Sequence, residues 1–484
     1  MELFLPDINL QAIAPEIILV VFACVILLLD AIFPRFNKTY LAFLAVVGTF
    51  FAFRSTILCW GRKEYVFREM MVIDNFSLFF NFIFLIGTAL TILISVGYMN
   101  REKFGHGEYY SLILFATSGM MFMGSGVDLI MIFLGLEIMS ISIYILAGFE
   151  KKNPVSNESA LKYFLLGAFA TGFLLYGIAL LYGVTGSTKL KAISQSLYPS
   201  SGSTSPLFYI GAGLLIIGFS FKIATVPFHM WVPDVYQGAP TAITAFMSAG
   251  VKAAAFAAFF RVVQTALTSI QADLTVVLWI LAVLTMTVGN VIAIAQENIK
   301  RMLAYSSIAH AGYILIALVA SNEIGASGLL FYLLAYTLMN IGAFAVVIFL
   351  SKKEDEAVNL SDYAGIGFKY PVLALCMTIF MVSLSGIPPT AGFIGKFYIF
   401  SAAVKANYIG LAVIGALNSA VSVFYYFRVI VMMYMKEPVK ERTELMISPS
   451  LAAAILCCAL GVMLLGVFPS AALHLTRASV LFLW

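Results

Sequence analysis

The sequence predicts an all-α polytopic membrane protein with about fourteen transmembrane helices. Three observations carry this prediction: 62% of the 484 residues are hydrophobic, only 11% are charged, and apolar runs of about 20 residues follow one another along the chain. A soluble domain is nearer half apolar and a quarter charged. So few charges cannot cover a water-facing surface, and a formal net charge of +4 does not indicate nucleic-acid binding.

The apolar runs leave no room for a soluble domain, so residues 1–484 are expected to form a single integral membrane domain. The first residues, MELFLPDINLQ, lack the basic region of a cleaved signal, and the first apolar run is expected to stay as a helix. The longest loop, about 185–205, is rich in serine and glycine and has no periodic pattern. The expected spans are 14–33, 41–60, 75–98, 109–125, 127–149, 160–184, 206–228, 241–265, 274–295, 302–320, 326–350, 371–402, 407–435 and 451–470.

Lysine and arginine in the loops indicate the orientation, because cytoplasmic loops carry an excess of both. The loops after odd-numbered helices hold 14 of them: Arg35, Lys38, Arg101, Lys103, Lys151, Lys152, Lys300, Arg301, Lys352, Lys353, Lys369, Lys436, Lys440 and Arg442. The other side holds 8: Arg54, Arg62, Lys63, Arg68, Lys189, Lys191, Lys405 and Arg477. The bias places the first set in the cytoplasm and both termini on the outer, periplasmic side.

Four ionisable side chains fall well inside the predicted helices, namely Glu137, Lys222, Lys252 and Lys396. An ionisable group at the bilayer centre costs about 2.5–3.5 kcal/mol on insertion scales, so the four would cost on the order of 10–14 kcal/mol if unpaired. That cost is comparable to the whole stability of a typical domain. The four side chains are therefore expected to face one another, or water, inside the helix bundle.

A buried ion pair between Glu137 and a lysine could serve only to fix helix packing, but three central lysines outnumber one central glutamate. Burial favours the neutral form of a lysine, and a nearby carboxylate favours the charged form. Buried lysines joined by water can therefore gain and release protons near neutral pH, whereas arginine stays protonated. The row of lysines predicts a proton relay.

Five further polar residues lie within or at the ends of the predicted helices. Lys162 lies about one turn inside the sixth span, where it could instead extend to the membrane interface. His310 falls in mid-span and could link the two halves of a relay, or be a hydrogen-bonded packing residue. Arg261 and Arg428 lie near helix ends and are interpreted as snorkelling or interfacial, and Asp128 as a helix-start residue.

Two of the lysines lie beside helix-breaking sequence. Lys222 is five residues before Pro227, and Lys396 follows SLSGIPPTAG with its two prolines, Pro388 and Pro389. Proline removes a backbone donor and interrupts a helix. Within a bilayer such breaks persist only where protein or water satisfies the freed groups.

The two interrupted spans are the seventh and the twelfth, five helices apart. Interrupted spans in corresponding positions of two halves are typical of a transport site. An offset of five places corresponding helices in opposite directions, so we expect two inverted five-helix repeats, approximately 109–265 and 274–435.

The cysteines predict neither a metal site nor an iron–sulfur cluster, because the chain has no CxxC spacing. Four of the five lie in apolar runs and are interpreted as small packing residues. A glycine-rich nucleotide-binding loop is also missing from the sequence. We therefore expect no cofactor and no metal in this chain.

Two long motifs resemble a known family. The run VPFHMWVPDVYQGAPTAITAFMSAGVKAAAF is similar to the signature of the antiporter-like membrane subunits of respiratory complex I, and so is ENIKRMLAYSSIAHAGYI. The resemblance covers nearly the whole chain. At WVPDVYQGAPT, the related subunits L and M and the multisubunit cation/proton antiporters tend to have an alanine-containing PDA run. Lys396 takes a position where subunit M typically carries glutamate.

The resemblance implies fourteen helices with inverted five-helix repeats and discontinuous seventh and twelfth helices. It also implies roles for individual residues. Glu137 and Lys222 match the family's control pair, Lys252 its eighth-helix lysine, Lys396 its terminal lysine and Lys162 its sixth-helix lysine. In this family NAD, FMN, the iron–sulfur clusters and quinone are bound by other subunits. The expected partners are the other membrane subunits of the complex, including homologous antiporter-like subunits, and the lipid of a bacterial inner membrane.

The leading hypothesis is a non-redox, proton-translocating subunit of an NADH:quinone oxidoreductase. Glu137 would modulate Lys222, which would exchange a proton through water with Lys252, by way of His310, and Lys396 would release it. Quinone reduction elsewhere in the complex would drive the cycle. The alternative is a subunit of a multisubunit sodium/proton antiporter. A third hypothesis is a structural spacer whose ion pairs only hold helices together.

Overall fold

The computed structural model describes residues 9–33, 37–102, 106–196, 205–351, 358–438 and 447–481. Six of the residues used to predict the orientation lie outside these ranges: Arg35, Lys103, Lys352, Lys353, Lys440 and Arg442. Within the described ranges, twelve helices are long and apolar enough to cross a membrane. The two other predicted spans correspond to the 18-residue helix α4 and to the interrupted pair α16 and α17. The predicted all-α membrane fold is confirmed.

The first six predicted spans are continuous helices: α1 (Ala14–Ile32), α2 (Lys38–Cys59), α3 (Asn75–Glu102), α4 (Glu108–Ser125), α5 (Leu129–Ala147) and α6 (Pro154–Thr185). A short antiparallel ribbon of β1 (Glu64–Val66) and β2 (Met71–Ile73) connects α2 to α3. The long loop, whose sequence has no periodic pattern, contains the helix α7 (Leu190–Ser196). Asn153 begins α6 by accepting the Val155 N–H, with a proline in the first turn.

The seventh and twelfth spans are interrupted, as the prolines predict. The helices on either side of the breaks are α8 (Pro206–Ile223) and α9 (Trp231–Gly238), then α16 (Pro371–Ser385) and α17 (Ala391–Lys405). Ala224 and Gly386 end α8 and α16 in the left-handed conformation, with φ of 63° and 82°. The peptide bonds before Pro227 and Pro389 are cis. Each break therefore leaves helix-terminal carbonyls without helical partners.

The eighth span contains a feature that the sequence analysis did not predict. It begins as α10 (Thr241–Phe246), continues as a π-helical turn η1 (Met247–Val251) and ends as α11 (Lys252–Thr265). Such turns occur often at functional sites. Lys252 is the first residue after this turn.

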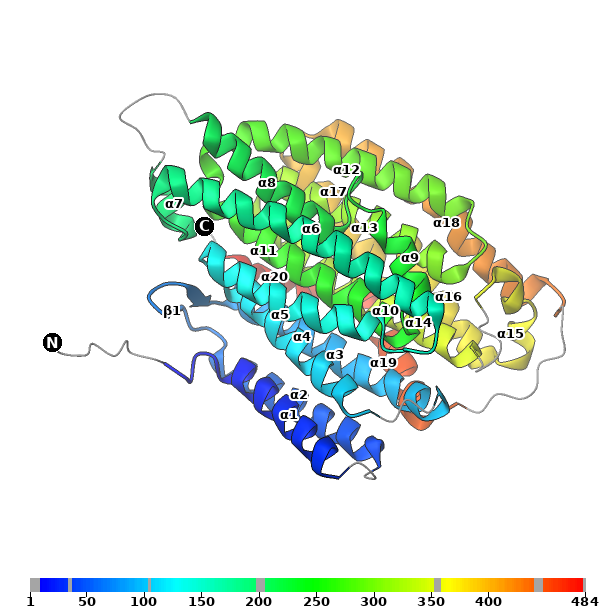
Figure 1. Ribbon diagram of the computed structural model, residues 1–484. Helices are drawn as coiled ribbons and strands as arrows, with labels where there is room; N and C mark the ends of the chain where they lie inside the picture. The colour runs from blue at the N-terminus through cyan, green and yellow to red at the C-terminus, as the bar shows by residue number, and fades with distance from the viewer. Residues whose placement is uncertain are drawn as a thin grey trace.

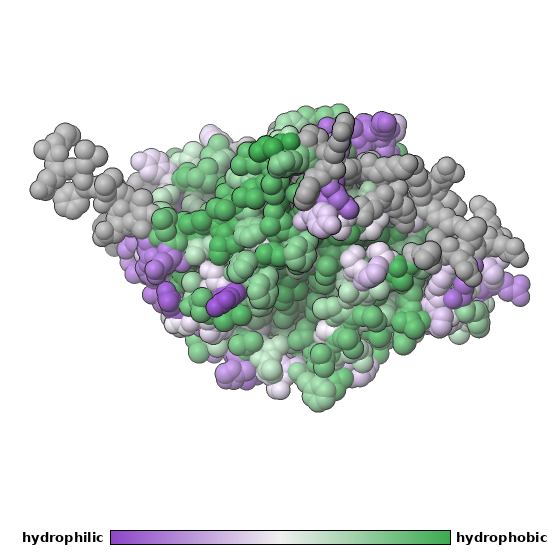
Figure 2. Space-filling model, turned by 90° about the horizontal axis from the view of Figure 1, so that it is seen from below, coloured by the Kyte–Doolittle hydropathy of each residue, from purple (hydrophilic) through white to green (hydrophobic). Residues whose placement is uncertain are grey.

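The remaining spans are η2 (Thr268–Ile270) with α12 (Gln271–Ile294), α13 (Ile299–Ala320), α14 (Glu323–Leu350), α18 (Ile409–Met435) and α19 (Pro449–Val467). Short connecting or terminal elements are η3 (Leu360–Tyr363), α15 (Ile366–Lys369) and α20 (Ser470–Val480). Helices α13 and α14 and the α10–α11 span are almost completely buried at the centre of the bundle, whereas α1 and α2 lie along one margin (Figure 1). From below, the surface is broadly hydrophobic, with hydrophilic residues gathered toward the margins (Figure 2).

The starts of α5 and α13 share a local arrangement. Asp128, which begins α5, forms a β-bridge with Lys189 before α7, and Asn298, which begins α13, forms one with Asn359 before η3. Elements α7 and α15 lie at opposite ends of the bundle (Figure 1). The shared arrangement at opposite ends supports an inverted relation between the two halves, while the repeat limits 109–265 and 274–435 stay a prediction.

Cysteine labelling tests this topology. We expect Lys191→Cys on α7 to react with a membrane-impermeant thiol reagent in intact cells, and Lys369→Cys on α15 to react only in inside-out vesicles. Both lysines are exposed at opposite ends of the bundle, and the loop charges predict that α15 lies on the cytoplasmic side. Labelling of both from the same side would contradict the fold, and exchanged sides would contradict only the orientation.

Candidate functional site

Lys222 occupies the last turn of α8, immediately before the first helix break, and is 1% exposed. Its Nζ donates hydrogen bonds to Ser140 Oγ at 2.8 Å and to Tyr144 OH at 3.2 Å, both on α5. The ammonium also lies 5.3 Å from the Tyr144 ring centre and 5.9 Å from the Tyr163 ring centre. Ring faces stabilise a cation without neutralising its charge.

The predicted pair of Glu137 and Lys222 is not in direct contact. Glu137 lies on α5 one turn before Ser140, and its buried Oε1 has no hydrogen-bond partner among the described residues. Lys222 instead reaches the next turns of α5, at Ser140 and Tyr144. Positions 137, 140 and 144 share one helix face, so the carboxylate and the amine face the same side, about one 5.4 Å turn apart.

Lys252 is 2% exposed and points from α11 to α13. Its Nζ donates to the Ser307 carbonyl oxygen at 2.7 Å and also to Ser307 Oγ. Both acceptors are neutral, so this lysine, like Lys222, is held by neutral oxygen atoms rather than by a carboxylate.

His310 lies on α13, one turn beyond Ser307, and is 1% exposed. Its Nδ1 lies 2.5 Å from Tyr332 OH of α14, and its Nε2 lies 2.9 Å from Tyr426 OH of α18. The Tyr426 hydroxyl also bonds Ser306 Oγ. The histidine is therefore fully hydrogen-bonded, as the packing interpretation requires. Both of its partners are hydroxyls that can pass a proton, as the relay interpretation requires.

Lys396 on α17 is 3% exposed and lies directly at the second break. Its Nζ donates to the carbonyl oxygens of Leu384 at 2.9 Å and Ser385 at 3.1 Å, which the end of α16 leaves free. It also donates to Ser419 Oγ at 2.9 Å. The negative end of the α16 dipole thus faces the amine. A cavity of about 620 Å³ borders Lys396 and extends to Lys405 at the end of α17.

Lys162 lies apart from the three buried lysines. Its side chain is 42% exposed and forms ion pairs with Glu158 at 2.8 Å and with Asp234 of α9 at 2.8 Å. Asp234 also binds Arg301 Nη1 of α13 at 2.9 Å. The sequence analysis missed Asp234 and Arg301 as partners, although both lie within the two motifs that carry the family resemblance.

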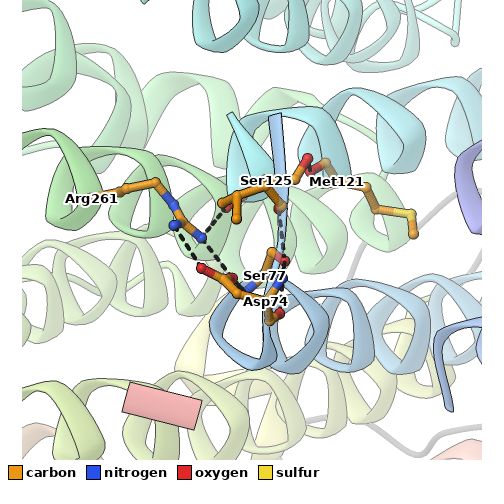
Figure 3. Close-up of polar contacts among 7 residues, drawn as sticks. Asp74, Ser77, Met121, Ser125 and Arg261 are labelled. Carbon is orange, nitrogen blue, oxygen red and sulfur yellow. Dashed lines mark hydrogen bonds and ion pairs between the residues drawn. The ribbon is translucent and has the colours of Figure 1, made fainter. Parts of the chain in front are cut away.

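Arg261 was interpreted as a snorkelling or interfacial residue, and this interpretation is wrong. Its guanidinium is 4% exposed and makes a two-pronged ion pair with Asp74, at 2.9 and 3.0 Å (Figure 3). Arg261 Nη2 also donates to the Gly124 carbonyl at 3.1 Å, and Asp74 accepts the Ser77 N–H at 2.8 Å. The pair joins α11 to the start of α3 and the end of α4.

Arg428 is partly buried and donates to the carbonyls of Ile294 and Gln296 at the end of α12, and its interfacial position stays a prediction. Asp128 begins α5 as predicted, with its carboxylate accepting the Ile130 N–H. Among the described residues no cluster of three or more His, Cys, Asp or Glu side chains has metal-binding geometry.

Comparison with known proteins identifies the family. A family model described as NADH:quinone oxidoreductase/Mrp antiporter, TM, matches residues 126–422, more than half of the chain. A relative from Trichlorobacter lovleyi named NADH-quinone oxidoreductase subunit N is 53% identical, over 98% of this chain and 97% of its own length. The chain belongs to the NADH:quinone oxidoreductase/Mrp antiporter family. Its similarity to subunit N confirms the family resemblance found in the motifs.

Other family members support the same grouping. Subunit N 1 of Herpetosiphon aurantiacus is 44% identical, with 98% of both chains covered. A chain of respiratory complex I from Thermus thermophilus superimposes with a TM-score of 0.82 at 36% identity, covering 96% of this chain and 100% of that one. A chain of the Mrp complex from Dietzia has a TM-score of 0.87 at 20% identity, covering 98% of each chain, which shows the shared fold alone.

Removal of one partner of the Arg261–Asp74 pair should destabilise this family member. Breaking a buried ion pair leaves an unpaired buried charge and costs about 3–5 kcal/mol. We expect both Arg261→Met and Asp74→Asn to lower the thermal denaturation midpoint of the purified protein strongly, because each leaves the other charge of the pair buried and unpaired. Arg54→Ala on exposed α2 is the control. A midpoint equal to that of the control would refute a structural role for the pair.

Proposed function

We propose that this chain is a proton-translocating membrane subunit of an NADH:quinone oxidoreductase. The single observation that carries the proposal is that Lys222, Lys252 and Lys396 are buried among neutral hydrogen-bond partners. All three are almost completely buried, and their described partners are hydroxyls and carbonyls. None of them forms an ion pair with a described carboxylate. A buried amine held only by neutral groups can lose its proton without leaving a carboxylate unpaired.

The proposed path runs across the bundle from one break to the other. Lys222 receives a proton and exchanges it through water with Lys252, which is bonded to Ser307. Ser306, the neighbour of Ser307, bonds Tyr426, and Tyr426 bonds His310. These hydroxyls and the imidazole carry the proton toward the second half. Lys396 then releases it into the cavity that extends to Lys405, a residue of the predicted outer side.

Glu137 is the proposed modulator of Lys222. A carboxylate that moves toward the amine favours its protonated form, and one that moves away favours release. The unpartnered Oε1 one turn from Ser140 leaves the glutamate able to change partners. Lys162 is proposed to act indirectly, because its ion pair with Asp234 ties α6 to the second part of the broken seventh span.

The energy for transport is proposed to come from partners. The expected partners are the other membrane subunits, including homologous antiporter-like subunits, with NAD, FMN, iron–sulfur clusters and quinone bound elsewhere in the complex. The names of the subunit N relatives support this assignment over the multisubunit sodium/proton antiporter. Co-purification decides between the two: redox subunits favour the oxidoreductase, and small membrane subunits alone favour the antiporter.

Substitution of the buried lysines tests the relay in the assembled complex. We expect Lys222→Ala and Lys396→Ala to lower proton pumping by an order of magnitude or more, since a positioned proton-transfer group typically contributes about 10²–10⁴-fold. Glu137→Gln should weaken pumping less than Lys222→Ala. Pumping is measured as the rate of proton uptake into membrane vesicles during NADH oxidation.

The matched control is Lys369→Ala, which removes an exposed lysine at the end of the bundle and should pump normally. Blue-native gels check that each variant assembles. Normal pumping in both Lys222→Ala and Glu137→Gln would refute the relay. Poor assembly, with intact pumping in the complexes that do form, would instead support a structural spacer.

A further inference from the structure

A large crevice opens at the end of the bundle that carries the loops after α3 and α5. Its volume is about 1020 Å³, and its walls come from α1, α4, α5 and α6. His106, Glu108, Lys151 and Lys152 line its outer part. Water occupies about 30 Å³ per molecule in the liquid, so the crevice has room for many water molecules. The loop charges place this end in the cytoplasm.

Tyr144 is the lining residue that connects the crevice to the relay. It lies on α5, is 8% exposed and belongs to the crevice wall. Its hydroxyl oxygen accepts a hydrogen bond from Lys222 Nζ at 3.2 Å. Lys222 itself is not part of the wall. The side chain of Tyr144 therefore lies between the crevice and a fully buried amine.

The position of the Tyr144 hydroxyl is set by its neighbours. The ring packs edge-on against Tyr163, with centres 4.8 Å apart. Gly167 of α6 leaves the space that the hydroxyl fills, because a Cβ at this position would lie 2.1 Å from the Tyr144 oxygen. The position of the hydroxyl therefore depends on the absence of a side chain at Gly167.

We propose that this crevice is the cytoplasmic proton entrance and that Tyr144 passes protons from its water to Lys222. When Lys222 is neutral, its Nζ accepts the Tyr144 proton, while the phenol oxygen takes a proton from a hydronium ion in the crevice. The O–H bonds of the phenol and of the hydronium ion break, a new phenol O–H bond and an N–H bond on Lys222 form, and the net result is one proton moved from the crevice water to the amine. The proposal rests on the proposed function, for which it supplies the entrance.

Three substitutions in the assembled complex test the role of Tyr144. Tyr144→Phe keeps the ring packing but removes the hydroxyl, and should lower proton pumping about tenfold or more. Tyr144→His restores a proton-carrying group and should recover part of the loss, which a purely structural role would not predict. Gly167→Ala leaves Tyr144 intact but displaces its hydroxyl, and should resemble Tyr144→Phe. Normal pumping in Tyr144→Phe and Gly167→Ala would overturn the proposal.

Thiol labelling tests whether the crevice holds water when the partner subunits are present. Phe115 lines the crevice from α4, whereas Ile141 lies on the exposed apolar surface of α5 outside it. We expect Phe115→Cys, and not Ile141→Cys, to react with an impermeant charged reagent from the cytoplasmic side, and the reaction to block pumping. The unsubstituted chain gives the background from its own five cysteines.

Failure to label Phe115→Cys would mean that a neighbouring subunit or lipid fills the crevice, and it would overturn the entrance. The variant Lys222→Ala distinguishes a failure of the proposed entrance from a failure of the whole relay. If Lys222→Ala abolishes pumping while Tyr144→Phe pumps normally, the relay stands and the entrance lies elsewhere. If Lys222→Ala pumps normally, the proposed function itself fails.

Discussion

The structure depends on the need to satisfy every polar group without bulk water. In a bilayer the helical backbone uses its own donors and acceptors, so a buried amine must find oxygen atoms elsewhere. The second helix break supplies two carbonyls to Lys396, and serine and tyrosine hydroxyls supply the acceptors for Lys222 and Lys252. Because these acceptors are neutral, they solvate a charged lysine and still leave it able to become neutral.

Three other basic side chains are held by carboxylates instead of by neutral oxygen atoms. Arg261 is matched by Asp74, and Arg301 and Lys162 share Asp234. These pairs join helices that are far apart in the sequence, α11 with α3 and both α6 and α13 with α9. The bundle thus separates two classes of charge, paired groups that fix the positions of helices and unpaired lysines that face hydroxyls. The proposed transport uses the second class, and the ion pairs of the first class hold the helices around it.

The helices, the two breaks and the burial of the central lysines could be predicted, because apolar runs, prolines and isolated charges are local signals. The partners of those lysines could not. Ser140, Tyr144 and Ser307 are ordinary residues of apolar helices, and only the packing of α5 and α13 against α8 and α11 gives them a role. Arg261 was misinterpreted for the same reason. The sequence shows that Arg261 lies near a helix end, but it does not show that Arg261 contacts Asp74, which is 187 positions away.

The packing around the buried tyrosines shows that a residue without a polar group can matter for the proposed function. Gly167 neither binds nor carries a proton, yet any side chain there would collide with the Tyr144 hydroxyl. Gly395 has the same relation to the ring of Tyr332, where a Cβ would lie 2.2 Å from a ring carbon. Selection on transport would therefore act on the empty space beside these tyrosines as strongly as on the tyrosines themselves. Even alanine, usually the mildest replacement in a helix, would collide with a tyrosine at both glycines.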